Sequence, residues 1–200
     1  MTELADPPKS KKEMRREAML DAAEALIIKG RGEFEIAQLA SAAGVSNGLA
    51  YHYFGSKDGV FEAVIDRFYA RYSTVMDRPA DPEIAWGVRE HARLLDTIAF
   101  LYADPFAPIA FGALGHAHAV EKEYSVQRNM IARAAHNVRS GQRRGQIPTD
   151  IDSELAGAAI IGAVRAVMMT AMRMDPRPAP EKVADQLWEL IAGAVRLGDG

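Results

Sequence analysis

The chain of 200 residues has no cysteine. This absence excludes disulfide bonds, thiolate metal sites and thiol redox chemistry. The sequence also lacks a nucleophile elbow, a phosphate-binding loop, a paired-carboxylate arrangement and a metal-binding cluster, so its motifs do not favour an enzyme. The polar, charged N-terminal stretch does not resemble a signal peptide. We therefore expect a cytoplasmic protein that is not an enzyme, needs no cofactor or metal, and has no membrane partner.

An excess of positive charge is missing as well, because 24 lysines and arginines face 27 acidic residues and the net charge is −3. What matters for a nucleic acid is the local field, and cations gather near the N-terminus with a single acid among them. These cations are Lys9, Lys11, Lys12, Arg15 and Arg16. The segment is either a solvated tail or an arm that becomes ordered on phosphates, and the two readings are compatible.

No convincing alternating strand pattern occurs, and apolar residues recur at helical spacing between proline and glycine breaks. The pattern predicts an all-α fold with a disordered arm over residues 1–10, a helix-turn-helix domain over 11–76 and a helical ligand-binding and dimerisation domain over 81–198. Pro79 and Pro82 mark the boundary. Longer helices are expected over 11–29, 57–76, 82–103, 119–144, 152–174 and 180–197, with a short, proline-broken one over 105–115.

The stretch from residue 39 to 61 predicts two short helices joined by a glycine turn and followed by a capped third helix. Gly44 can take the left-handed conformation that closes the first helix, and Val45 can fill the corner. Either Ser46 or Asn47 can cap the second helix. Such a pair is a common way to insert one helix into a DNA groove.

The second short helix carries unusual chemistry for a core helix. Gly48 leaves no side chain between the backbone and an approaching molecule. Tyr51, His52 and Tyr53 offer hydroxyl and imidazole donors to phosphates. Ser56 caps the following helix, and its first turn carries Lys57, so positive charge and free backbone amides converge there.

The motifs AGVSNG and YHYFGSK, within residues 15–68, resemble the DNA-binding domain of the TetR family of bacterial transcriptional repressors. The resemblance implies that the second helix reads the major groove and that an effector loosens the grip on DNA. By position, the residues expected to face bases are Ser46, Asn47, Gly48 and Leu49, and those expected to hold the backbone are Tyr51, Tyr53 and Lys57, with His52 beside them. Phe34 and Glu35 stand where the family commonly has two threonines, and Leu49 and Ala50 where it has Thr-Leu.

The segment 152–174 is small and apolar nearly all round, so it must be covered on most sides. A membrane span is disfavoured because Arg165 lies inside it. We expect a two-fold, four-helix dimer interface with the last helix, and the alternative is a monomer core. The predicted interface residues are Ala156, Ala159, Gly162, Ala163, Trp188, Ile191 and Val195.

An adaptable apolar cavity can be built from aromatic and methionine side chains of the second domain, although the same residues are equally compatible with a core. The candidates are Trp86, Leu94, Phe100, Tyr102, Phe106, Phe111, Tyr124, Met130, Arg165 and Met169. Arg165 could hold an anionic ligand or pair with an interfacial acid. His116 and His118 are too few ligands for a metal.

Together these features favour a sequence-specific regulator, a repressor released from a palindromic DNA operator by a small, largely apolar effector. The expected partners are a double-stranded, pseudo-palindromic operator, a small-molecule effector and a second copy of the chain. The alternative is a ligand-binding helical dimer with little DNA specificity, and an enzyme is less favoured.

Overall fold

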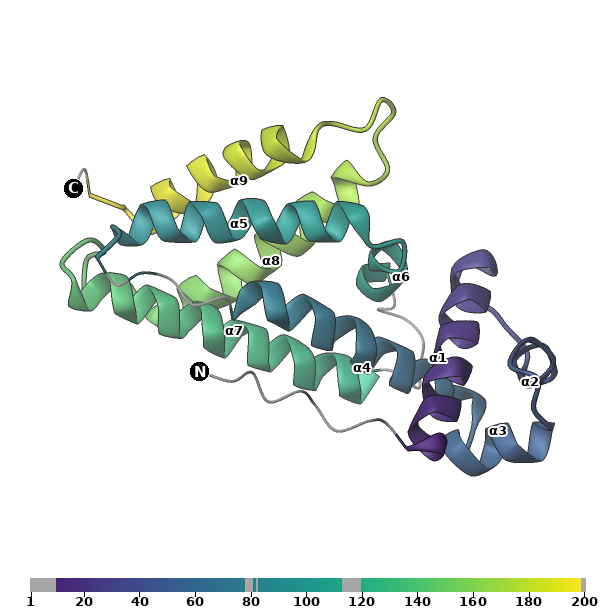
Figure 1. The fold of residues 1–200 in the computed structure, drawn as a ribbon. Coiled ribbons are helices and arrows are strands. Elements are labelled where there is room, and N and C mark those ends of the chain that lie inside the picture. The colour runs from purple at the N-terminus through teal and green to yellow at the C-terminus, as the bar shows by residue number, and fades with distance from the viewer. Residues whose placement is uncertain (1–9, 78–80, 82, 113–119, 199–200) are drawn as a thin grey trace, which may run out of the picture. The chain divides into compact units, whose positions relative to one another are not determined.

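A computed structural model describes residues 10–77, 81, 83–112 and 120–198 (Figure 1). Among them there is no strand, so the predicted all-α fold is confirmed. The described helices are α1 (Lys11–Lys29), α2 (Ile36–Ala42), α3 (Asn47–Phe54), α4 (Lys57–Met76), α5 (Trp86–Ala103), α6 (Ala107–Gly112), α7 (Val120–Arg143), α8 (Ser153–Ala171) and α9 (Pro180–Ala194). Lys9 and the rest of the expected arm up to residue 9 lie outside the described part of the chain.

Packing divides the chain into two units, Met1–Arg67 and Phe68–Gly200. The division falls inside α4, which is one continuous helix from Lys57 to Met76. Its first half packs Val60 and Val64 in the first unit, and its second half contributes Phe68 and Tyr72 to the second. Residues of α4 therefore belong to both units.

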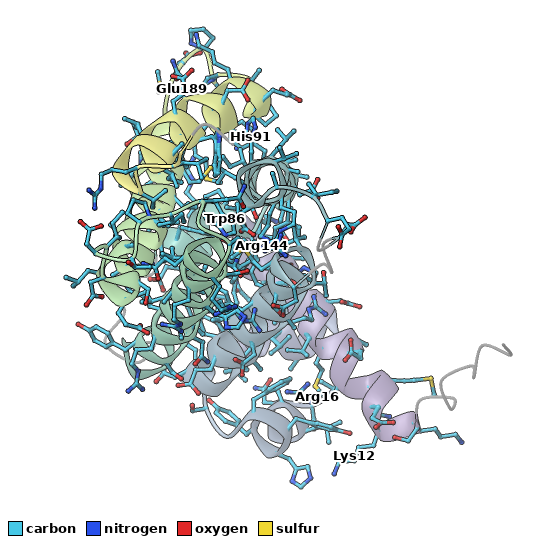
Figure 2. The ribbon with its side chains drawn as sticks, turned by 90° about the vertical axis from the view of Figure 1, so that its left-hand side faces the viewer. Lys12, Arg16, Trp86, His91, Arg144 and Glu189 are labelled. Carbon is cyan, nitrogen blue, oxygen red and sulfur yellow. The ribbon has the colours of Figure 1, made fainter. Side chains whose placement is uncertain are left out.

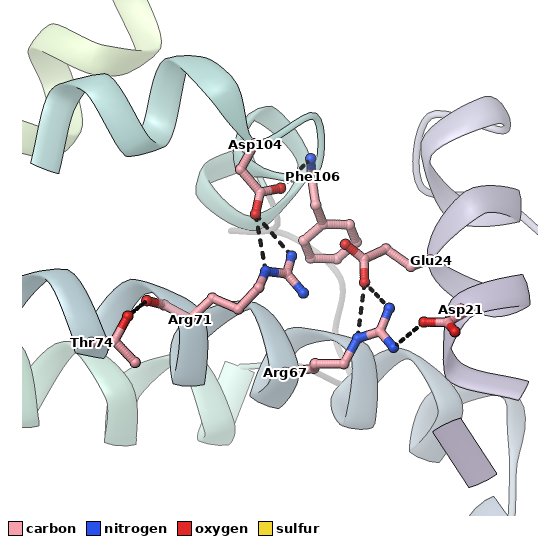
Figure 3. A network of polar contacts seen from close by, with 7 residues as sticks. All are labelled: Asp21, Glu24, Arg67, Arg71, Thr74, Asp104 and Phe106. Atoms are coloured by element: carbon pink, nitrogen blue, oxygen red, sulfur yellow. Dashed lines mark hydrogen bonds and ion pairs between the residues drawn. The ribbon is translucent and has the colours of Figure 1, made fainter. Parts of the chain in front are cut away.

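The first unit is held by the buried face of α1 and a polar clamp on α4. Ser10 and Glu13 form a reciprocal capping box at the start of α1. Arg67 donates to Glu24 and to Asp21, at 2.6 Å for the latter (Figure 3). Because the Glu24 side chain is only 13% exposed, this ion pair is shielded from solvent and fixes α1 against α4.

The second unit pairs α7 with α8 and α5 with α9. Gly157 permits the first pairing, because a Cβ there would lie 2.8 Å from the backbone of Ile131 and Ala135. Trp86, the first residue of α5, is buried with Val138, Ile147 and Val195, and its indole N–H donates to the Asn137 carbonyl at 2.7 Å. α8 is long and apolar enough to span a membrane by length and composition alone, a property it shares with core helices of soluble proteins.

A second polar clamp orders the region around α6. Arg71 donates two hydrogen bonds to one carboxylate oxygen of Asp104, the shorter at 2.8 Å, and the other oxygen accepts from the backbone of Phe106 (Figure 3). Phe68, Tyr72, Phe100 and Phe106 form an aromatic cluster within this unit. Phe68 and Phe106 are fully buried in this cluster, and Tyr72 also borders a cavity described below.

Candidate nucleic-acid interface and effector cavity

The turn between α2 and α3 has the predicted geometry. Gly44 has a φ of +64°, a left-handed conformation that favours glycine. The N–H of Val45 donates to the Ala40 carbonyl at 2.9 Å and closes the end of α2. The left-handed Gly44 and the backbone hydrogen bond of Val45 therefore define this turn.

Ser46, rather than Asn47, caps α3. Its hydroxyl oxygen accepts from the backbone N–H of Leu49 at 3.2 Å. Asn47 is the first helical residue and is exposed, so its amide group remains available to a binding partner. This hydrogen bond resolves the two capping options that the sequence left open.

One face of α3 is open to solvent. Asn47, Gly48, Tyr51 and His52 are all exposed, and their spacing places them on one side of the helix. Tyr51 is 50% exposed although it is large and apolar in part, whereas Ala50 is fully buried against the unit. The face therefore presents the hydrogen-bonding side chains of Asn47, Tyr51 and His52, and Gly48 leaves the backbone uncovered between them.

Leu49 and Tyr53 are half-buried, so they lie at the edge of this face. The Tyr53 hydroxyl donates to the backbone carbonyl of Lys12 at 3.5 Å. A phosphate is also an acceptor, so the long bond to Lys12 must break before Tyr53 can donate to a phosphate. Lys12 and Arg16 extend from the same helix, α1 (Figure 2).

Lys57 begins α4 next to an acidic loop. Its ammonium lies 3.1 Å from a carboxylate oxygen of Glu35 and 3.9 Å from one of Glu33, and it also sits 5.4 Å from the centre of the Phe34 ring. Ser56 caps the helix by accepting from the Gly59 N–H at 3.0 Å. Sequence reasoning missed the two acids as partners of Lys57, and the run Glu-Phe-Glu before α2 is the signal that could have suggested them.

A small cavity of about 70 Å³ lies within the second unit. Two of the predicted residues, Trp86 and Leu94, line it, and Trp188, predicted for the dimer interface, lines it too. Ile191, also predicted for the dimer interface, lines it as well, and the rest of the wall was not predicted for a site and consists of Tyr72, Met76, Glu90, Arg93, Thr97, Ala134, Asn137, Ile160, Ile161 and Val164. Both tryptophans of the chain therefore border the same cavity.

The cavity has one polar wall. Glu90 accepts from Arg93 at 3.2 Å and from Asn137 at 3.1 Å, and Arg93 also donates to the carbonyl of Met76, the last residue of α4. Burial raises the pKa of Glu90, although Arg93 and Arg89 oppose the shift. The wall is a charge-balanced network in an otherwise apolar space.

The other predicted pocket residues do not line this cavity. Phe100 and Phe106 belong to the aromatic cluster, and Tyr102 lies under the guanidinium of Arg177, which is 3.8 Å from its ring centre. Tyr124 is 57% exposed, and Met169 is half-buried outside the cavity. The helical spacing of these residues showed which side of each helix is apolar, but it did not show which other helix packs against that side.

Arg165 lies at a separate, smaller hollow with Phe111 and Met130. Its guanidinium donates to the backbone carbonyl of Phe111 at 2.6 Å and sits 5.8 Å from the centre of that ring. The sequence suggested a ligand or an interfacial acid as the partner of Arg165, and it did not suggest this backbone carbonyl. His116 and His118 lie outside the described residues.

The predicted interface residues separate into two sets. On α8, Ala159 and Gly162 are exposed and Ala156 and Ala163 are half-buried, as an open helix face requires. On α9 the expectation needs correction, because Ile191 and Val195 are buried within their own unit and Trp188 stacks on His91 at 5.4 Å. The apolar stripe of α9 faces inward, and Leu190 is a large apolar residue of this helix that projects outward and is 67% exposed.

A groove of about 550 Å³ runs between α8 and α9 on this open side. Its lining includes Ala166, Val167, Thr170, Met174, Gln186 and Leu190. Leu155, near the start of α8, is 72% exposed as well. Large apolar side chains left in water on two neighbouring helices are typical of an interaction surface.

The comparisons with known proteins agree with this geometry. Residues 19–64 match the model of bacterial regulatory proteins of the tetR family. The chain is 25% identical over 195 residues to the nucleoid occlusion factor SlmA of Vibrio campbellii, covering 94% of this chain and 98% of that one. It is 42% identical over 60 residues, 30% of each chain, to the regulator BetI of Yersinia pestis.

Among solved structures, SmeT, the repressor of the Stenotrophomonas maltophilia multidrug efflux pump SmeDEF, is 20% identical with a TM-score of 0.77, covering 92% of this chain and 91% of SmeT. At this identity the likeness concerns the fold. The α2-turn-α3 geometry and the open face of α3 define a helix-turn-helix DNA-binding protein. The DNA-binding part of the chain, residues 19–64, is that of bacterial regulatory proteins of the tetR family.

Proposed function

We propose that the protein is a homodimeric repressor that holds a pseudo-palindromic operator through α3 and releases it when a small, largely apolar effector binds the second unit. The observation that carries the proposal is the exposed face of α3, where Asn47, Gly48, Tyr51 and His52 lie together. Ser46 and Leu49 flank this face, and Tyr51, Tyr53 and Lys57 are the proposed phosphate contacts. The protein acts in the cytoplasm and catalyses no reaction.

The effector site is the cavity beside Trp86 and Trp188. Its apolar lining suits an apolar ligand, and its volume of about 70 Å³ requires side chains to move aside for anything larger than a few atoms. SmeT, which shares the fold, has been solved in complex with triclosan. The Arg93 hydrogen bond to Met76 gives the cavity a direct connection to α4.

Dimerisation uses the open face of α8 and α9, where Ala159, Gly162 and Leu190 are exposed. Small residues on α8 let a second helix approach closely. Two α3 helices linked by symmetry bind successive half-sites, which raises affinity well above that of one short helix. An effector needs to change operator affinity by only about 1 to 3 kcal/mol to act as a switch.

The test is selection of bound duplexes from a random DNA pool by the purified protein at a fixed, moderate salt concentration. We expect enrichment of one palindrome. Recovery of no preferred sequence would overturn the operator proposal and leave a ligand-binding helical dimer.

A second candidate is a nucleoid occlusion factor, because the likeness to SlmA extends over nearly the whole chain whereas that to BetI covers only the DNA-binding part. The same selected sequence separates the two. Copies at one or a few promoters favour the repressor, and copies dispersed over much of the chromosome favour the second candidate.

A further inference from the structure

Lys57, the proposed phosphate contact at the start of α4, already has an anionic partner inside the protein. Glu35 is in hydrogen-bonding range at 3.1 Å, and Glu33 adds a second carboxylate at 3.9 Å. Both acids are exposed, at 73% and 77% of the side chain, while Lys57 is 39% exposed. A phosphate approaching Lys57 therefore meets two carboxylates at the same place.

The position of Glu35 is fixed by the helix that it precedes. Its backbone N–H donates to the side chain of Gln38 at 3.0 Å, and its carbonyl accepts from the backbone N–H of Leu39 at 3.1 Å. These bonds hold the residue at the start of α2 with its side chain directed to Lys57. The Phe34 ring, 5.4 Å from the ammonium, supports the same placement of the cation.

We propose that Glu35, assisted by Glu33, competes with the DNA backbone for Lys57 and thereby lowers operator affinity and its salt dependence. This inference rests on the proposed DNA-binding function. Binding DNA breaks the internal ion pair and leaves two carboxylates near a phosphate, so part of the attraction of Lys57 is cancelled. Glu35 is thus a residue that sets affinity without touching a base.

The competition has a measurable signature. An exposed ion pair contributes about 0.2–1 kcal/mol, so removing the Glu35 charge is expected to tighten binding by about 1.4-fold to fivefold for each half-site. A lysine released for a phosphate adds up to about 0.9 to the slope of log affinity against log salt. Glu33 lies farther from the ammonium, so its removal has the smaller effect.

The experiment measures operator affinity of the full-length protein across a salt series, with the duplex obtained by selection, for wild type, Glu35→Gln, Glu33→Gln and Lys57→Met. Glu189→Gln on α9 removes the same charge in the second unit and serves as the control (Figure 2). We expect tighter binding and a steeper salt slope for Glu35→Gln, and no change for the control. Both acids are exposed, so thermal stability is expected to stay near that of wild type.

The double variant Glu35→Gln with Lys57→Met isolates the interaction. If Glu35 acts through Lys57, its removal gains nothing once the lysine is gone. A gain that persists in the Lys57→Met background would mean general repulsion of DNA and would overturn the inference. If the wild type binds the duplex and Glu35→Gln binds it with the same affinity and salt slope, the inference is overturned and the proposed function stands. If the wild type binds no duplex, the proposed function is overturned and this inference with it.

Discussion

Gly48 separates the demands of folding from those of DNA binding. It lies in the first turn of α3 and is exposed. A Cβ built on it would meet only the Ser46 hydroxyl oxygen, at 3.9 Å, which is ordinary contact. Alanine is a better helix former than glycine by about 0.5–1 kcal/mol, so Gly48→Ala is expected to stabilise the protein by up to that amount.

The same methyl group stands on the face proposed to approach the bases. If the backbone at Gly48 lies close to the DNA, an added carbon forces a separation that weakens neighbouring contacts by about 1 kcal/mol, the low end of the cost of one mismatched base pair. A dimer carries the change twice, so operator affinity falls by about 2 kcal/mol, or roughly 30-fold. Gly48→Val enlarges the loss because its branched side chain is bulkier.

Two assays on the same samples decide the matter. Thermal unfolding reports stability, and fluorescence anisotropy with a labelled operator reports affinity at one salt concentration. Gly59→Ala is the contrasting variant, because a Cβ there would lie 2.0 Å from the Phe54 carbonyl oxygen and must disturb the fold. If Gly48→Ala keeps the operator affinity of wild type, the backbone at Gly48 does not lie close to the DNA. If its melting temperature falls markedly, the space around Gly48 in the protein is not open to an added Cβ.

Three other outcomes follow from the described contacts. Tyr51→Phe is expected to weaken binding to all duplexes to a similar degree in anisotropy titrations, because a phosphate contact carries no sequence information, and a loss confined to one operator position would contradict it. Leu190→Glu is expected to give a folded monomer by analytical ultracentrifugation, and a persistent dimer would remove the open face from the interface. Burial raises the pKa of Glu90, so the folded state keeps its proton to a higher pH than the unfolded state. The free energy of unfolding therefore falls as pH rises through that interval, and denaturant titrations of Glu90→Gln should lack this component.

The parts of the fold that the sequence predicted depend on local chemistry. The left-handed Gly44 and the Ser46 cap are separated from their partners by only a few residues, so the pattern of side chains is enough to place them. The helix from residue 11 to 29 is likewise bounded by its own cap and a following glycine, and its limits agree with α1. Residues within about one helical turn of each other are enough to determine such features.

The parts that the sequence could not place are set by contacts between distant segments. Lys57 and Glu35 are 22 positions apart, and Glu90 and Asn137 are 47 apart. Helical periodicity shows which side of a helix is apolar, but it does not show which other helix covers that side. For this reason the predicted pocket list includes Trp86 and Leu94, which line the described cavity, together with Phe100 and Phe106, which belong to the aromatic cluster.

Helix α9 shows how one misplaced residue changes the functional argument. Trp188 was expected on an outer face shared with a second subunit, yet it lines the cavity and stacks on His91. Leu190, two positions later, projects to the other side of the helix and is exposed. A ligand that displaces Trp188 thus acts on the same helix that presents the proposed dimer face. Under the proposed function, effector binding and subunit arrangement would therefore be linked through α9 itself, without a separate relay between them.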